Sequence, residues 1–99
     1  MAPKQFPIAR TEPVITSSYV TEGGEPILYV SHDPDDESAT GGAWQFHCGN
    51  GDYAMERMQL VALETILAID PSVAEVADMP IGYGARRTAP GATWHIAAE

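Results

Sequence analysis

Short runs of alternating apolar and polar residues, separated by turn residues, occur along the chain and are typical of β-strands. The run Val-Ile-Thr-Ser-Ser-Tyr-Val predicts a strand over residues 14–20, and a more apolar run predicts a second over residues 27–31. Residues 21–25, Thr-Glu-Gly-Gly-Glu, lie between them and have the composition of a turn. These two strands are therefore expected to pair as a β-hairpin.

A third strand is predicted over residues 43–48, after a polar loop at residues 33–42. Because successive side chains of a strand point to opposite faces, one face would carry Trp44, Phe46 and Cys48, and the other Ala43, Gln45 and His47. Cys48 and Trp44 are expected to pack in the core, whereas His47 is expected at the surface or at an edge.

Residues 55–69 change to a helical spacing. Steps of three and four residues place four apolar side chains on one helix face: Leu60, Leu63, Ile66 and Leu67. One long helix fits this spacing about as well as a short strand over residues 59–62 followed by a helix over residues 64–68.

The pair Asp70-Pro71 is the clearest local signal. Aspartate is favoured as an N-cap, proline is favoured at the first helical position, and the residue before proline resists α geometry. One helix should therefore end near Ile69, and a second should begin at Pro71. The second helix is expected to bury Val73, Val76 and Ala77.

Two further strands are predicted over residues 83–88 and 93–97, joined by the turn residues Ala-Pro-Gly-Ala. This order predicts an α+β fold with a small, mainly antiparallel sheet of about five strands and two short helices between the third and fourth strands. A chain of 99 residues fits one domain, expected over residues 14–99, after an irregular leader at residues 1–13.

The charge of the chain is strongly one-sided, with 14 acidic and 5 basic residues and a formal net charge of −9 at pH 7. Nucleic acids and anionic membrane surfaces repel such a chain, so neither is expected as a partner. A basic protein is the natural counterpart, because complementary charge accelerates encounter. The alternative is that the acids serve solubility alone.

The acids are also unevenly placed. No Lys or Arg occurs between Arg10 and Arg57, and the acids of this stretch lie mostly in turns bordering the first three predicted strands. If those loops share one edge of the sheet, they form a single negative face. The residues expected to contact a basic partner are Glu22, Glu25, Asp33, Asp35, Asp36, Glu37 and Asp52.

The sequence offers little for catalysis or metal binding. His47 and Cys48 are neighbours on a predicted strand and would face opposite ways, which does not suit a nucleophile–base pair. His32 and His95 are too isolated to complete a zinc site. The acidic loop that begins at Asp33 lacks the glycine and the bidentate glutamate of a calcium loop. The chain is therefore predicted not to be an enzyme and to hold no metal or cofactor.

Adjacent strand residues diverge, so Arg86 and Arg87 are expected to provide one outward charge and one intramolecular ion pair rather than an anion clamp. A single cysteine, Cys48, rules out an internal disulfide. Without a secretory apolar segment or a membrane-length apolar run, the chain is predicted to be cytoplasmic.

Several stretches, in order over residues 14–87, resemble the DUF2185 family, also described as the Imm33 type of bacterial immunity proteins. Residues 22–29, Glu-Gly-Gly-Glu-Pro-Ile-Leu-Tyr, resemble its GG-x-P-V-x-Y hairpin, and residues 42–49, Gly-Ala-Trp-Gln-Phe-His-Cys-Gly, its SGW-x-F-x-x-G strand. Residues 66–72, Ile-Leu-Ala-Ile-Asp-Pro-Ser, resemble its I-L-x-x-D-P-S segment, and residues 80–82, Pro-Ile-Gly, its closing P-x-G. The resemblance implies a bacterial α+β domain that neutralises a toxin by direct binding, and it supplies no catalytic residues.

The residues and the resemblance together predict a small acidic interaction protein of the immunity type, which binds a basic toxin through its acidic face. The alternative is a small-ligand or regulatory binding domain that uses a pocket between the sheet and the helices.

Overall fold

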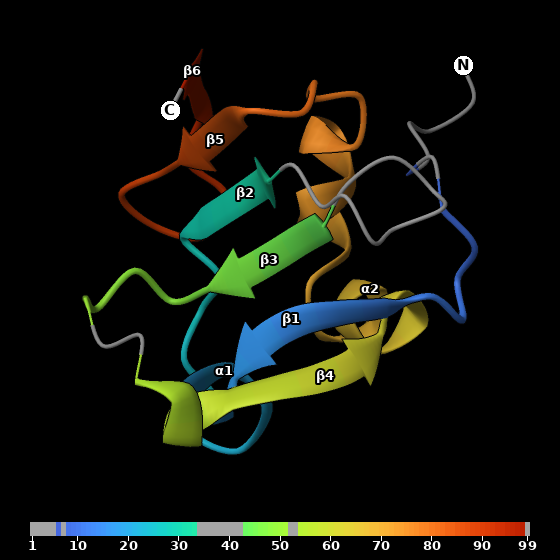
Figure 1. The fold of residues 1–99 in the computed structure, drawn as a ribbon. Coiled ribbons are helices and arrows are strands. Elements are labelled where there is room, and N and C mark those ends of the chain that lie inside the picture. The colour runs from blue at the N-terminus through green and yellow to red at the C-terminus, as the bar shows by residue number, and fades with distance from the viewer. Residues whose placement is uncertain (1–5, 7, 34–42, 52–53, 99) are drawn as a thin grey trace.

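The computed structural model describes residues 6, 8–33, 43–51 and 54–98, and it places a six-stranded sheet against a layer of short helices (Figure 1). The strand order is β4-β1-β3-β2-β5-β6, with β1 and β3 parallel and all other neighbours antiparallel. The elements in chain order are β1 (Pro13–Ser17), α1 (Ser18–Thr21), β2 (Tyr29–Asp33), β3 (Ala43–His47), η1 (Met55–Arg57), β4 (Met58–Ala62), α2 (Leu63–Ile69), η2 (Pro71–Val76), β5 (Tyr83–Arg86) and β6 (His95–Ala98). The predicted α+β class with a mainly antiparallel sheet is confirmed.

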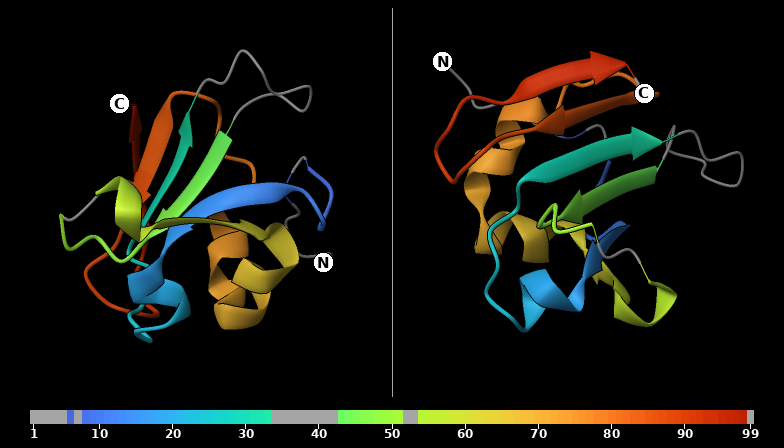
Figure 2. Two further views of the ribbon diagram at one scale, coloured as in Figure 1. Left: turned by 60° about the horizontal axis from the view of Figure 1, so that its bottom comes forward. Right: turned by 90° about the vertical axis from the view of Figure 1, so that its left-hand side faces the viewer.

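The helical segments α2 and η2 lie together on one face of the sheet (Figure 2). Among the described residues no helix covers the opposite face, which we call the open face. In that same part of the chain, no helix has the length and apolar composition needed to cross a bilayer.

The predicted hairpin of the first two strands is not formed. β1 ends at Ser17, where α1 begins, and β1 pairs with β3 and β4 while β2 pairs with β3 and β5. Val20 and Ile27, which flank the predicted turn, are 3% and 0% exposed. The helical turn of α1 places Val20 in the core, and the segment between α1 and β2 places Ile27 there.

Gly23 makes this turn possible. Its N–H donates a hydrogen bond to the Ser18 carbonyl over 3.0 Å. A Cβ at this position would lie 2.8 Å from the carbonyl oxygen of Tyr19, which is closer than van der Waals contact allows. The glycine that was predicted for a hairpin turn therefore ends a helix.

The region from Met58 to Ile69 is a strand followed by a helix, and the alternative of one long helix is wrong. β4 pairs along its whole length with β1, in a register that places Leu60 opposite Ile15. Leu60 thus points away from the core and is 71% exposed. The three-residue step from Leu60 to the buried Leu63 had predicted that both would lie on one apolar helix face. Pairing with β1 outweighs the helical pattern in residues 58–62. Because β4 is added to the predicted strands, the sheet has six strands instead of about five.

The core lies between the sheet and the helices and contains Trp44 and Phe46 at its centre. Phe6, from the stretch predicted as an irregular leader, packs edge-on against both rings, with centroid distances of 4.7 and 5.8 Å. This part of residues 1–13 therefore belongs to the packed domain. The other buried apolar residues are Val14, Val20, Ile27, Val30, Cys48, Leu63, Ile66, Val73, Val76, Ala77, Met79, Ala85 and Trp94.

The Asp70-Pro71 signal is confirmed. α2 ends at Ile69, and η2 begins at Pro71 as a 3₁₀-helix. The Asp70 carboxylate accepts hydrogen bonds from the backbone N–H of Ser72 at 3.0 Å and from its hydroxyl at 2.6 Å. The three residues predicted to be buried by this helix are all in the core.

Arg87 joins this cap to the rest of the molecule, and we call the contacts of its guanidinium group the Arg87 junction. Its Nε and Nη2 donate to the carbonyl of Ile27 at 3.0 and 2.9 Å, and Nη2 also donates to the carboxylate of Asp70 at 2.6 Å. Nη1 donates to the Ser72 hydroxyl at 2.9 Å, and the group lies 4.2 Å from the centre of the Trp94 ring. The predicted intramolecular ion pair is thus formed by Arg87, which is buried, whereas Arg86 is exposed.

We expect Arg87→Leu to lower the free energy of unfolding by about 3–5 kcal/mol, because it leaves the Asp70 charge and the Ile27 carbonyl without their guanidinium donor. Urea denaturation of both proteins measures this loss. The neighbouring Arg86→Ala removes an exposed charge with a cation–π contact to Tyr29 and is expected to cost only about 1 kcal/mol or less. Equal effects of the two substitutions would contradict a structural role specific to Arg87.

The junction also predicts how stability depends on pH. Burial raises the pKa of Asp70, but hydrogen bonds from Ser72 and Arg87 and the positive charge of Arg87 outweigh this and lower the pKa below its ordinary value of 3.8. The unfolded chain therefore binds more protons in the acid range. Stability from this group is present above pH 3.8 and is lost as the pH falls through the lowered pKa. Urea midpoints of the wild type should fall more steeply between pH 5 and pH 3 than those of Asp70→Asn, and equal slopes would count against this contribution.

Candidate functional site

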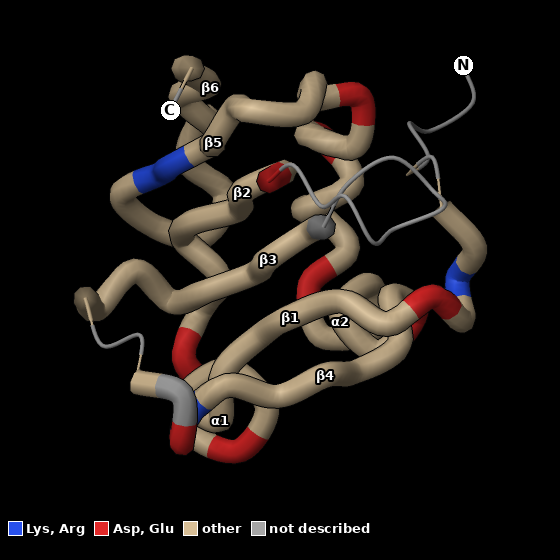
Figure 3. The backbone as a smooth tube through the Cα atoms, viewed as in Figure 1, with Lys and Arg blue, Asp and Glu red and all other residues tan. Residues whose placement is uncertain are grey.

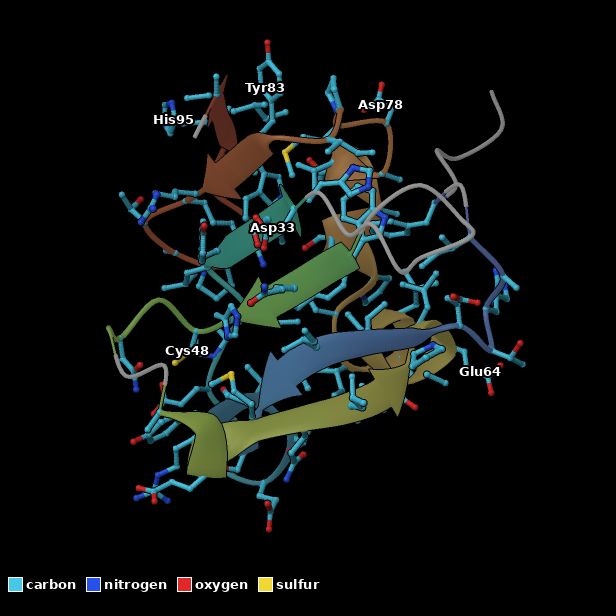
Figure 4. The ribbon with its side chains drawn as sticks, viewed as in Figure 1. Asp33, Cys48, Glu64, Asp78, Tyr83 and His95 are labelled. Carbon is cyan, nitrogen blue, oxygen red and sulfur yellow. The ribbon has the colours of Figure 1, made fainter. Side chains whose placement is uncertain are left out.

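Polar and aromatic side chains gather on the open face at the centre of the sheet. The alternate positions of β2 and β3 point to the core, so the positions between them point to the open face. In the strand register Ser31 lies opposite Gln45, and Tyr29 lies opposite His47. These residues and Asp33 form a continuous surface across two central strands, and Figure 4 shows Asp33 on this face.

A chain of hydrogen bonds links three of these side chains. Gln45 Nε2 donates to Asp33 Oδ2 over 2.7 Å, and Gln45 Oε1 lies 2.9 Å from His47 Nε2. The hydroxyl of Ser31 also donates to Asp33 Oδ2, at 3.2 Å. The two bonds of Gln45 have ordinary lengths, whereas the Ser31–Asp33 bond is long for a hydroxyl donor.

This chain determines the tautomer of His47. The carboxylate of Asp33 is only an acceptor, so the amide nitrogen of Gln45 must face it and the amide oxygen must face His47. That oxygen needs a donor, so His47 carries its proton on Nε2. In the neutral ring, the lone pair is then on Nδ1.

His47 is only 2% exposed, so the prediction of a surface position is wrong. Its ring lies on the open face but is packed between neighbours, and it stacks on Tyr29 with a centroid distance of 6.2 Å and an interplanar angle of 21°. Burial lowers the pKa of His47 below its ordinary value of 6.5, and the negative charge of Asp33 offsets part of this effect. His47 is therefore neutral at pH 7.

Arg86 extends the stack on the next strand. β5 pairs with β2 so that Arg86 lies opposite Tyr29, and its guanidinium carbon is 4.3 Å from the centre of the Tyr29 ring. This distance is typical of a cation–π contact. Arg86, Tyr29 and His47 thus form one layer over β5, β2 and β3.

The other half of the open face is apolar. Ile15 of β1 and Met58 and Leu60 of β4 cover it, and Leu60 is the most exposed large apolar side chain of the described residues. Leu60 lies opposite Ile15, which in turn lies opposite Gln45 of β3. The apolar half and the polar chain therefore adjoin each other directly.

Together these side chains line an open groove of about 670 Å³ across the face of the sheet. We call it the open-face groove. Its lining comes from strands β1 to β5: Ile15, Tyr29, Ser31, Asp33, Gln45, His47, Met58, Gln59, Leu60 and Arg86.

Three of the acids predicted to contact a partner lie within the described residues, and they do not gather at this groove. Glu22 and Glu25 are exposed in the turn after α1, before β2 begins, whereas Asp33 is the last residue of β2 (Figure 3). The two sites are thus at opposite ends of one strand, and of the three only Asp33 lines the groove. Four others lie outside the described residues: Asp35, Asp36, Glu37 and Asp52.

The neighbours His47 and Cys48 are separated as predicted. Cys48 is a buried thiol in the core, while His47 points to the open face. Within residues 6, 8–33, 43–51 and 54–98, no group of three or more His, Cys, Asp or Glu side chains is close enough to hold a metal ion. His32, also buried, has its Nδ1 2.8 Å from the Met79 carbonyl and stacks on Trp44 at 3.9 Å, so it is a packing residue.

Sequence reasoning identified only part of the groove. The alternation of residues 43–48 correctly placed Gln45 and His47 on one face, but no local pattern joins Tyr29, Leu60 and Arg86 to them. Their meeting depends on the strand order, which alternation does not reveal.

Comparisons with family models, with curated proteins and with solved structures found no match to this chain. The resemblance to DUF2185 proteins stays a prediction.

The hydrogen-bond chain predicts the titration of His47. We expect NMR titration to give a His47 pKa below 6.5, and Asp33→Asn to lower this pKa further, because the substitution removes the negative charge that favours the imidazolium. Since the unfolded chain binds a proton at His47 more readily, stability should fall as the pH drops below 6.5. The exposed His95 serves as the control in the same spectra, and a rise in the His47 pKa in Asp33→Asn would contradict the proposed coupling.

Proposed function

We propose that this protein is a binding domain that docks a basic protein partner on the open-face groove. The observation that carries the proposal is the exposed side chain of Leu60, 71% accessible, beside a polar chain that is held in place by hydrogen bonds. An exposed apolar anchor next to fixed polar groups is the composition of a protein–protein interface.

The shape of the groove favours a macromolecular partner. Sites for small ligands usually bury most of the ligand surface within a cleft. This groove lies across strands of a sheet, and its apolar half ends at β4, an edge strand. A protein surface covers such a face more completely than a small molecule does.

The two charged ends of the groove indicate the chemistry of the partner. Asp33 ends β2 and Arg86 lies opposite Tyr29 at its start, so the backbone positions that carry the two opposite charges are about 13 Å apart, at about 3.3 Å per residue. A partner segment with a Lys or Arg at the Asp33 end and an acceptor at the Arg86 end fits this arrangement. Apolar side chains of the same segment would contact Ile15, Met58 and Leu60.

The polar groups are already in place before binding. Asp33 is held by Ser31 and Gln45, and His47 is held by Gln45 and by its stack on Tyr29. Ordering side chains on association costs free energy, so a preorganised surface retains more of its contact energy. The net charge of −9 supports a basic partner overall, because it accelerates the encounter of oppositely charged proteins.

The resemblance to immunity proteins supports a narrower proposal, in which the basic partner is a toxin. Co-expression with the toxins encoded beside this gene tests it directly. A toxin that is neutralised by the wild type but not by groove variants would support the immunity role. Growth inhibition that the wild type does not relieve would count against that role and leave the binding function to be tested separately.

For the binding function, a photo-reactive residue at position 60 should crosslink to the partner in extracts of cells that make this protein. The captured protein is then purified and its affinity is measured. Leu60→Asp and Asp33→Lys should each weaken binding by about 10–100-fold, since each removes a groove contact. Binding of the wild type should also weaken as the ionic strength rises.

Two variants outside the groove are the controls. Asp78→Lys changes the net charge as much as Asp33→Lys does, and Ile69→Asp replaces an exposed apolar residue of α2 as Leu60→Asp does for β4. Both should bind like the wild type. If they weaken binding as much as the groove variants, or if position 60 gives no specific adduct, the proposal is wrong.

A further inference from the structure

The strand β6 forms one edge of the sheet, and its outer side has no pairing partner among the described strands. It pairs with β5, and no other described strand adjoins it. All four of its residues, His95–Ala98, are exposed. In Figure 1, α2 lies behind β1 and β4, on the other side of the sheet from β6.

An edge of this kind is unusual because sheet edges are normally protected by charges, proline or a covering element. The other edge strand, β4, has no charge within it but is flanked by charges on both sides: Glu56 and Arg57 precede it, and Glu64 follows it closely. β6 has the sequence His-Ile-Ala-Ala, with neither a permanent charge nor a proline. Its backbone hydrogen-bonding groups are accessible to another strand.

An apolar patch adjoins this edge on the helical side of the sheet. Tyr83 lies opposite Ala98 and Ile96 lies opposite Ala85, so Tyr83 and Ile96 are diagonal neighbours on one face. They are 38% and 48% exposed. Figure 4 shows Tyr83 and His95 at this end of the molecule, where Tyr83 points away from the body of the domain.

The charge distribution indicates what covers the edge. From Met79 to Ala98 the chain has no Asp or Glu, although the whole protein carries 14 acids. In Figure 3, neither β5 nor β6 carries an acidic position. Two molecules with a charge of −9 each repel one another over most of their surfaces, and the end of the sheet formed by β5 and β6 is where they can approach without opposing carboxylates.

We propose that β6 pairs with β6 of a second copy of this chain, antiparallel and about a twofold axis perpendicular to the sheet. This axis keeps the helices of both copies on the same side of one continuous sheet, and it places Ile96 opposite Ile96 of the second copy. The apolar patches then meet across the axis.

This association is independent of the proposed binding function. Leu60 of the open-face groove lies on β4, at the opposite edge of the sheet. The dimer would present two open-face grooves on one side, and each could take a partner.

Analytical ultracentrifugation of the purified protein should show a concentration-dependent dimer. Ile96→Lys places two ammonium groups opposite each other at the axis, and we expect it to raise the dimer dissociation constant by about 100-fold or more. Ile96→Glu should do the same with two carboxylates. A mixture of the two variants pairs opposite charges and should form a heterodimer, which shows that position 96 faces itself and that both variants are folded.

Leu60→Lys is the matched control, because it places the same charge on an exposed apolar residue of the other edge strand and should leave the dimer intact. A wild type that stays monomeric up to about 1 mM would overturn the proposal. So would dissociation by Leu60→Lys to the same extent, or a mixture of the two Ile96 variants that does not associate.

Discussion

The packing of this small domain depends on one buried cation. Arg87 stands where β5 leaves the sheet, and its guanidinium group contacts the segment before β2, the N-cap of η2 and the ring of Trp94. The first two segments also have backbone hydrogen bonds, from the Leu28 N–H to the His47 carbonyl and from the Asp70 N–H to the Ile66 carbonyl, and Arg87 links them to each other. A charge removed from water is costly unless it is paired and fully hydrogen-bonded. The guanidinium group of Arg87 has its hydrogen-bond partners only when the three segments are in their native arrangement. Leucine or methionine could fill the same volume, but neither would orient the segments.

Local signals in the sequence were sufficient for much of the fold. The Asp70-Pro71 pair marks the boundary between two helices because capping and proline geometry act within a few residues. Alternation likewise identified the faces of the strand from Ala43 to His47. Residues 14–28 were misread because a turn-like Gly-Gly sequence is compatible with both a hairpin and a helix end. The choice depended on whether Val20 and Ile27 could reach a core formed by distant residues.

The open-face groove shows the same limit for a functional site. Charge counting drew attention to acids in turns, yet Glu22 and Asp33 lie at opposite ends of β2. The residues that do meet come from five strands, and most of them are uncharged. Their arrangement follows from the order β4-β1-β3-β2-β5, in which the strands that contribute Leu60, Gln45 and Arg86 are far apart along the chain. A pattern within one strand can show which way a side chain points, but it does not show which strand lies next to it.

The same strand order has a consequence for biosynthesis. β1 pairs with β3 and β4, so its partners in the sheet are made long after β1 itself. While the ribosome is still adding residues 18–42, neither pairing partner of β1 has been made, and its apolar residue Val14 has no finished core to enter. Closing these long loops before any contact is gained makes folding slow relative to a protein built from local hairpins. The N-terminal third of the nascent chain is therefore the segment most exposed to aggregation and to capture by chaperones.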